Sequence, residues 1–124
     1  RLAGTMRRLQ EDIDMRDELI KLITVKGEKR SSRGFSEGED IEETEVFASV
    51  LSVTGTEFYD ALRSGIDAKI KFAVDLDDYI LGNYLVDGKV KKPSRIRWNE
   101  IEYRIIREYK VNRHEIQITC EEVS

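Results

Sequence analysis

The chain has 124 residues, of which 40% are hydrophobic and 37% are charged, and its formal net charge is −4. This length suits a single domain, and the composition excludes collagen-like, disordered and membrane-spanning chains. The acidic balance argues against a protein whose main role is to grip nucleic-acid phosphates, because that role needs clustered and uncompensated Lys and Arg.

Apolar residues recur at helical spacing near the start of the chain, which predicts a short helix at about residues 5–15. We expect residues 1–16 to form a helical extension whose apolar stripe docks on the domain or on a neighbouring subunit. The domain is expected to span residues 17–124. It begins with a predicted strand, ELIKLITVK, that ends at Gly27.

Residues 27–43, GEKRSSRGFSEGEDIEE, are polar and rich in Gly and Ser, and they form the most loop-like part of the sequence. They predict a mobile surface hairpin, with a partner-contacting arm as the alternative. The next predicted strand, TEVFASVLSV, is apolar on both alternations. That pattern is typical of a strand that is covered on both faces.

The stretch SVTGTEFYDALRSG predicts one short central helix, Thr56–Arg63, with turns at Gly55 and Gly65. Phe58 and Leu62 share one face of this helix. We expect these two side chains to close one end of the core.

Three further segments complete the predicted fold. IDAKIKFAVDLD alternates strictly, which predicts a strand with one buried face, and residues 77–94 carry turn signals for an extra hairpin or a long excursion. RIRWNEIEYRIIREYKV predicts two strands joined tightly near residues 99–100, before a last strand with Ile116, Ile118 and Cys120 inward. The sequence therefore predicts a mainly β protein: a small antiparallel β-barrel or sandwich of about six strands, with one short central helix and an N-terminal helix.

Residues that carry chemistry are sparse. His114 is the only histidine and Cys120 the only cysteine, so catalytic triads, intrachain disulfides and His- or Cys-based metal sites lack their usual members. His114 precedes the last strand, which indicates a turn residue. Asp75, Asp77 and Asp78 offer oxygen ligands but lack the Gly and the distal Glu of a calcium loop. We expect no enzyme activity, no cofactor and no metal, with catalysis by surface carboxylates as the weakest alternative.

The basic stretch KVKKPSRIRW supports a second hypothesis for function. Its Lys91, Lys92, Arg95, Arg97 and Trp98 are similar to the nucleic-acid surface of a small barrel. The alternative function is therefore a small β-barrel module that binds nucleic acid or peptide. The overall acidity favours instead a charged, outward-facing strand.

Five motifs follow one another within a resemblance that covers roughly residues 17–123: EVFASVLSVTG, TEFYDAL, DAKIKFAVDL, RIRWNEIEYRII and HEIQITCEEV. Their order resembles the head–tail adaptor, or head-completion, family of long-tailed bacteriophages. In that family a strand ends in a small-residue turn before a Glu-Phe/Tyr helix, here Thr56–Tyr59. An Arg-hydrophobic-Arg-aromatic hairpin, here Arg95–Ile105, precedes the last strand. The N-terminal helix and the excursion at 77–94 depart from the common short members.

The resemblance implies a structural virion protein of the head–tail junction, made in the cytoplasm of a bacterial host and encoded by a phage or a prophage remnant. Such a protein assembles as a ring below the portal, closes the DNA channel after packaging and presents a surface to which the tail docks. The implied partners are a portal-side adaptor, tail proteins and further copies of the chain, which alone would be a monomer or weak oligomer. DNA would pass without tight binding, which fits the acidic charge, and no membrane is expected.

The central helix would then act as a movable insert or a subunit contact, because its flanking glycines give the backbone freedom. Phe58 and Leu62 remain the candidate core residues of this helix. The candidate ring or channel contacts are Gly55, Thr56, Tyr59, Asp60, Arg63 and Gly65.

Overall fold

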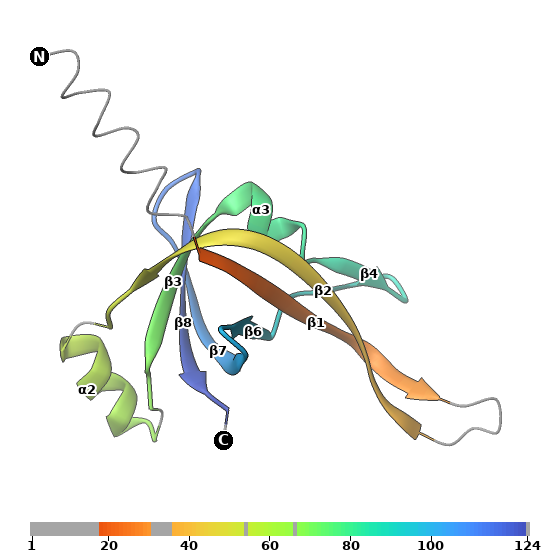
Figure 1. Cartoon of the computed structure of the whole chain (residues 1–124), viewed down its shortest axis with the longest axis horizontal. Helices are drawn as coiled ribbons and strands as arrows, with labels where there is room; N and C mark the ends of the chain where they lie inside the picture. The colour runs from red at the N-terminus through yellow and green to blue at the C-terminus, as the bar shows by residue number, and fades with distance from the viewer. Residues whose placement is uncertain (1–17, 31–35, 54, 66, 124) are drawn as a thin grey trace, which may run out of the picture.

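Strands dominate the computed structural model of the chain, which describes residues 18–30, 36–53, 55–65 and 67–123 (Figure 1). The predicted N-terminal helix and the extension 1–16 lie outside these residues. The elements in chain order are β1 (Glu18–Arg30), β2 (Ser36–Leu51), α2 (Gly55–Arg63), β3 (Ile70–Asp75), α3 (Leu76–Ile80), β4 (Tyr84–Val86), β5 (Lys89–Lys91), β6 (Arg95–Trp98), β7 (Ile101–Lys110) and β8 (Glu115–Glu122).

Six of the strands pair antiparallel in the order β1-β2-β3-β8-β7-β6. β6 pairs again with β1, but only over the short stretch Lys21–Ile23. β4 and β5 form a separate two-stranded hairpin. The mainly β class, the six antiparallel strands and a short helix after β2 are therefore confirmed.

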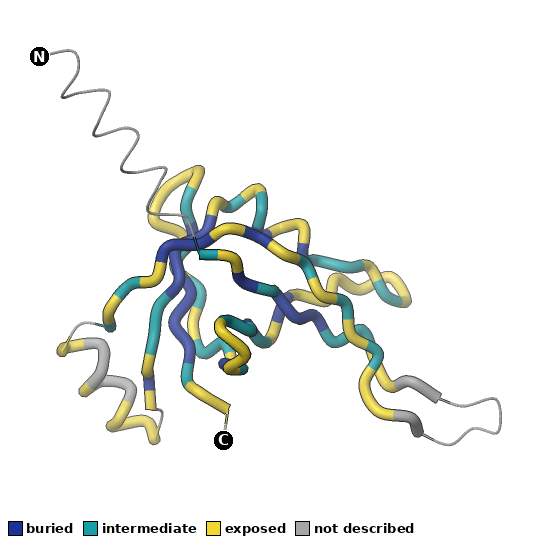
Figure 2. Tube along the Cα trace, viewed as in Figure 1, coloured by how far each residue is buried: buried dark blue, intermediate teal, exposed yellow. Residues whose placement is uncertain are grey.

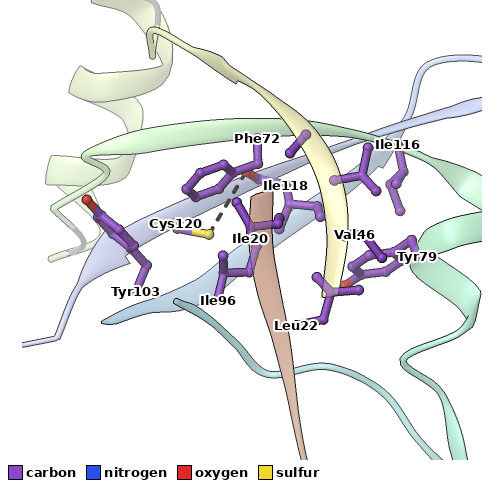
Figure 3. Close-up of a cluster of buried hydrophobic side chains, with 12 residues drawn as sticks. Ile20, Leu22, Val46, Phe72, Tyr79, Ile96, Tyr103, Ile116, Ile118 and Cys120 are labelled. Atoms are coloured by element: carbon purple, nitrogen blue, oxygen red, sulfur yellow. Dashed lines mark hydrogen bonds between the residues drawn. The ribbon is translucent and has the colours of Figure 1, made fainter. Parts of the chain in front are cut away.

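The core lies between the inward faces of the six strands (Figures 2 and 3). Phe72 is fully buried, and its ring meets Trp98 and Tyr103 edge-on at centroid distances of 5.9 Å and 5.8 Å. Because side chains alternate along a strand, the cross-strand partners of β3 and β8 fall on this one face. The predicted inward positions on both strands are confirmed, namely Ala68, Ile70, Phe72, Val74, Leu76, Ile116, Ile118 and Cys120, of which Ile70 and Leu76 are partly buried against the core; Ile66 lies outside the described residues.

The β1–β2 hairpin extends well beyond the other strands (Figure 1). Only residues 48–51 of β2 pair with β3, and only residues 21–23 of β1 pair with β6. Residues 24–30 and 36–42 pair as strands only with each other, and we call this two-stranded segment the arm.

The arm corrects two expectations from the sequence. The segment 27–43 is a hairpin, as predicted, but its loop-like character is wrong where the structure describes it, because β1 continues to Arg30 and β2 begins at Ser36. Contact of this hairpin with a partner stays a prediction. Phe47 is 56% exposed and Val50 is also exposed, so β2 is not covered on both faces.

The excursion after β3 contains both a turn of helix, α3, and the β4–β5 hairpin. The hairpin is confirmed, whereas α3 was not expected. Thr24 Oγ1 donates a hydrogen bond to the carbonyl oxygen of Gly82 at 2.5 Å, and the hydroxyls of Thr44 and Tyr84 lie 3.1 Å apart. These contacts hold the excursion against the base of the arm.

Two-residue turns close both short hairpins. Asp87 and Gly88 join β4 to β5 with φ values of 51° and 77°, and Asn99 and Glu100 join β6 to β7 with 51° and 65°. Positive φ at both central residues is the pattern of the type I′ turns that match strand twist. The predicted tight turn near residues 99–100 is confirmed.

Candidate interaction surfaces

Helix α2 carries most of the residues that the sequence singles out. It begins at Gly55 and is followed by Gly65, whose φ of 77° and N–H bond to the carbonyl of Leu62 at 2.9 Å give a glycine-closed end. Gly55, Thr56, Tyr59, Arg63 and Gly65 are all exposed, so these five candidates are accessible from solvent.

One of the two residues that were expected to bring this helix into the core is exposed. Leu62 is 44% exposed and lies outside the buried cluster, so it does not close the core as expected. An apolar side chain that stays in water gains no burial free energy, so Leu62 adds little to the stability of the core. The side chains of Phe58 and Asp60 lie outside the described part of the chain.

The two arginines of the basic stretch are held by carboxylates on the outer face of the sheet. Arg95 donates to Glu39 at 2.7 Å and to Glu102 at 3.4 Å. Arg97 donates to Glu43 at 2.8 Å and to Glu102 at 3.4 Å. Glu102 on β7 thus bridges both arginines of β6, while the other two carboxylates come from β2.

This five-residue network also covers apolar surface. Ile23 pairs in register with Glu43 and Arg95, which places it on their face, yet it is fully buried. The aliphatic parts of long charged side chains shield such residues while their charged ends stay near water. The pKa of Arg95 is raised, chiefly by its hydrogen bond to Glu39 and further by the charge of Glu102.

The remaining residues of the second hypothesis are also mostly engaged. Lys92 Nζ lies 3.3 Å from Glu108 Oε1, and Trp98 Nε1 donates to Glu18 Oε2 at 3.1 Å. Within the described residues, Lys91 alone of the five has no such partner. A phosphate backbone would have to displace carboxylates from this surface, which opposes the nucleic-acid alternative.

A cavity of about 310 Å³ lies beside α3. The Tyr79 hydroxyl donates to Glu108 within it, and burial, followed by this carboxylate, raises the pKa of Tyr79. Asn83 Oδ1 is buried and finds no hydrogen-bond partner among the described residues. The lining is Leu76, Tyr79, Ile80, Asn83, Lys92, Glu108, Lys110 and Ile116.

A larger hollow of about 670 Å³ lies between the start of β3 and the ends of β7 and β8. It is lined mainly by charged side chains that pair among themselves, Lys69 with Asp67 at 3.2 Å and Arg104 with Glu121. These two ion pairs involve four of its five charged residues, and Glu122 adds a further negative charge.

The residues expected to be chemically inert are placed as follows. His114 is exposed in the connection between β7 and β8, which confirms it as a turn residue. Cys120 is buried, and this burial raises the pKa of its thiol to about 12. Among the described residues, no three His, Cys, Asp or Glu side chains gather to hold a metal ion.

Two findings concern the chain as a whole. No helix in the described ranges has the length and apolarity needed to cross a membrane. The sequence matches no protein-family model and no curated protein.

The carboxylates of the outer-face network were missed at the level of sequence. Glu39 and Glu43 lie 56 and 54 residues away from the arginines they bind. Only the Arg-x-Arg spacing hinted at the network, because it puts both guanidinium groups on one face of a strand.

Proposed function

We propose that this protein is a structural component of the head–tail junction of a tailed bacteriophage or prophage. It assembles as a ring below the portal, closes the DNA channel after packaging and presents the surface to which the tail docks. The six-stranded sheet acts in this proposal as a small barrel that forms the wedge-shaped body of each subunit.

The order of elements supports the proposal. EVFASVL lies in β2, TEFYDAL in α2, KFAVD in β3, RIRW and IEYRII in β6 and β7, and EIQITCEE in β8. The motifs that resemble the head-completion family thus fall on a strand, a helix, a strand, a hairpin and a strand, which is the sequence of parts that the resemblance requires.

The arm is the observation that carries the proposal. Its strands pair only with each other, so it adds little to the core of its own subunit. A long two-stranded projection leaves unpaired backbone groups along an edge, and natural proteins use or protect such edges. A subunit built to contact neighbours in a ring has a use for such a projection.

The charge distribution is compatible with DNA passage. Arg95 and Arg97, which would otherwise hold phosphates, are bound by carboxylates, and the net charge is negative. Each phosphate contact made through released counterions would retard moving DNA. A neutralised surface avoids this retention.

Immunogold electron microscopy tests the proposal. Particles released from the source strain after induction are labelled with antibody raised against the purified chain, with antibody absorbed on the same chain as the control. We expect gold at the junction between head and tail. Label that is absent from particles, or confined to capsid faces or tail tips, contradicts the proposal.

A further inference from the structure

A bulge in β7 brings two charged side chains to the inner face of the sheet, beside the cavity at α3. The register between β7 and β8 shifts within residues 105–107. After this shift Glu108 stands opposite Ile118, and Lys110 stands opposite Ile116. Both isoleucines belong to the core cluster, and residues directly opposite in a sheet share one face. The bulge thus re-aims a carboxylate and an ammonium group toward the face that carries the core.

Helix α3 and the segment that follows it form another wall of the cavity. Tyr79 lies at one end of the core cluster (Figure 3), and its hydroxyl donates a hydrogen bond to Glu108. A Cβ added to Gly82 would come within 2.7 Å of Pro93 Cγ and 3.3 Å of Leu22 Cδ1. Glycine permits this close approach. The tight packing fixes this wall before any ligand binds.

Two polar groups that line the cavity have no partner among the described residues. Asn83 Oδ1 is buried and accepts no hydrogen bond from them. Lys110 is exposed at the rim and forms no ion pair or hydrogen bond with them. Both oxygens of Glu108, in contrast, are engaged, one by the Tyr79 hydroxyl and the other by Lys92 Nζ at 3.3 Å. The cavity therefore offers one unused acceptor and one unused positive charge.

The rest of the lining and the size of the cavity restrict the kind of ligand. Leu76, Ile80 and Ile116 supply an apolar surface. The volume of about 310 Å³ lies at the lower end of the roughly 300–1,000 Å³ of ligand pockets, which combine apolar walls with a few polar groups that fix orientation. Two lysines and one glutamate line the cavity, which gives a net formal charge of +1. A small, singly charged anion balances this charge.

We propose that this cavity binds a small organic carboxylate whose apolar body carries a hydroxyl or N–H group. The carboxylate pairs with Lys110, and the hydroxyl or N–H group donates to Asn83 Oδ1, because a buried acceptor without a donor costs free energy. The apolar body lies on Leu76, Ile80 and Ile116. Binding of this kind is a property of the single subunit, so it goes beyond the proposed function and does not require a ring.

A titration followed by proton–nitrogen correlation NMR tests the inference. The probe is para-hydroxyphenylacetate, which has a carboxylate, an apolar ring and a hydroxyl. We expect saturable shift changes that are confined to the amides of residues 76–83 and 108–116. Phenylacetate lacks the hydroxyl and para-hydroxyphenylacetamide lacks the charge, so each should bind several-fold more weakly. No saturable change at millimolar concentrations, or equal affinity for all three compounds, would overturn the proposal.

Three variants assign the affinity to the cavity. Lys110→Met should weaken binding of para-hydroxyphenylacetate several-fold and remove its advantage over the amide. Asn83→Leu should remove its advantage over phenylacetate. Lys89→Met is the matched control, because this exposed lysine of β5 does not line the cavity, and it should leave the affinity unchanged.

The control also defines the contradicting result. Equal weakening by Lys89→Met and Lys110→Met would show attraction to surface charge alone and would overturn the cavity as the site. The spectrum of each variant reports whether it is folded. Because Lys110 is exposed, its variant keeps the test decisive even where Asn83→Leu does not fold.

The outcome is independent of the labelling experiment. Gold at the junction without binding of the carboxylate would leave the connector function in place and remove the ligand site. Binding that depends on Lys110, without any particle label, would do the reverse.

Discussion

Phe72 is a core residue whose packing is expected to contribute strongly to the stability of the fold. It has no exposed surface, and two aromatic rings meet it edge-on. Phe72→Ala should lower the free energy of unfolding by about 3–5 kcal/mol, because the variant loses apolar burial and leaves a cavity. Urea denaturation followed by tryptophan fluorescence measures this loss.

The control for this prediction is Tyr109→Ala on β7. Tyr109 is an exposed aromatic residue, and a surface change of this kind is usually within about 0.5 kcal/mol. Equal losses in the two variants would show that Phe72 is not the centre of the core.

Cys120 gives a prediction about alkaline pH. Burial raises the pKa of its thiol from 9.0 to about 12 in the folded chain. The unfolded chain releases this proton first, so the stability that the neutral thiol contributes is complete below about pH 9 and is lost as the pH rises toward 12. The wild type should therefore lose unfolding free energy across this interval, whereas Cys120→Val, which has no thiol, should not lose this contribution. A difference that stays constant from pH 8 to the alkaline limit of folding would contradict this account.

Among the elements, the β6–β7 hairpin has a non-glycine residue in an unfavourable backbone conformation. Glu100 has φ of 65° at the second position of its turn, where a side chain costs roughly 1–2 kcal/mol. Glu100→Gly should raise the free energy of unfolding by about 0.5–1 kcal/mol, because relief of this strain exceeds the extra entropy of glycine in the unfolded chain. Thermal and urea melts measure the gain.

The equivalent position of the β4–β5 hairpin supplies the reciprocal control. Gly88 has φ of 77°, and an added Cβ there would meet no neighbouring atom. Gly88→Ala should therefore destabilise through backbone strain alone. A Glu100→Gly variant that loses stability would show that the Glu100 side chain contributes more than its backbone conformation costs.

Strands with one buried face could be predicted from the sequence, whereas the length of the two strands in the arm could not. The apolar residues of β3 and β8 recur at every second position because one face of each strand packs on the core, although Ala73 and Thr119 on the other face are buried too. Both faces of the arm are largely polar, so residues 27–43 have no apolar alternation and resemble a loop. Helix α3 escaped prediction because five residues are too few to show a helical period.

The candidate site could be predicted only where it depends on residues that are close together in the sequence. The helix and its terminal glycines depend on local turn chemistry, which neighbouring residues determine. The exposure of Leu62 and the pairing of Arg95 with Glu39 depend instead on how distant segments pack. Sequence spacing within one element holds no information about such partners.

At the scale of the whole molecule, burial is unevenly distributed (Figure 2). The core cluster draws its side chains from the six-stranded sheet and α3, while the arm lies outside it and the described apolar residues of α2 are exposed. A chain with one well-packed body and peripheral elements suits a subunit whose remaining surface is buried on assembly. The acidic charge and the neutralised arginines fit the same role beside moving DNA.

The most direct test of this role is to delete the gene from its source element and count particles by electron microscopy. The account predicts DNA-filled heads without tails and separate free tails, with complete particles restored when the wild-type gene is supplied in trans. Unchanged numbers of complete, tailed particles after deletion would contradict the account.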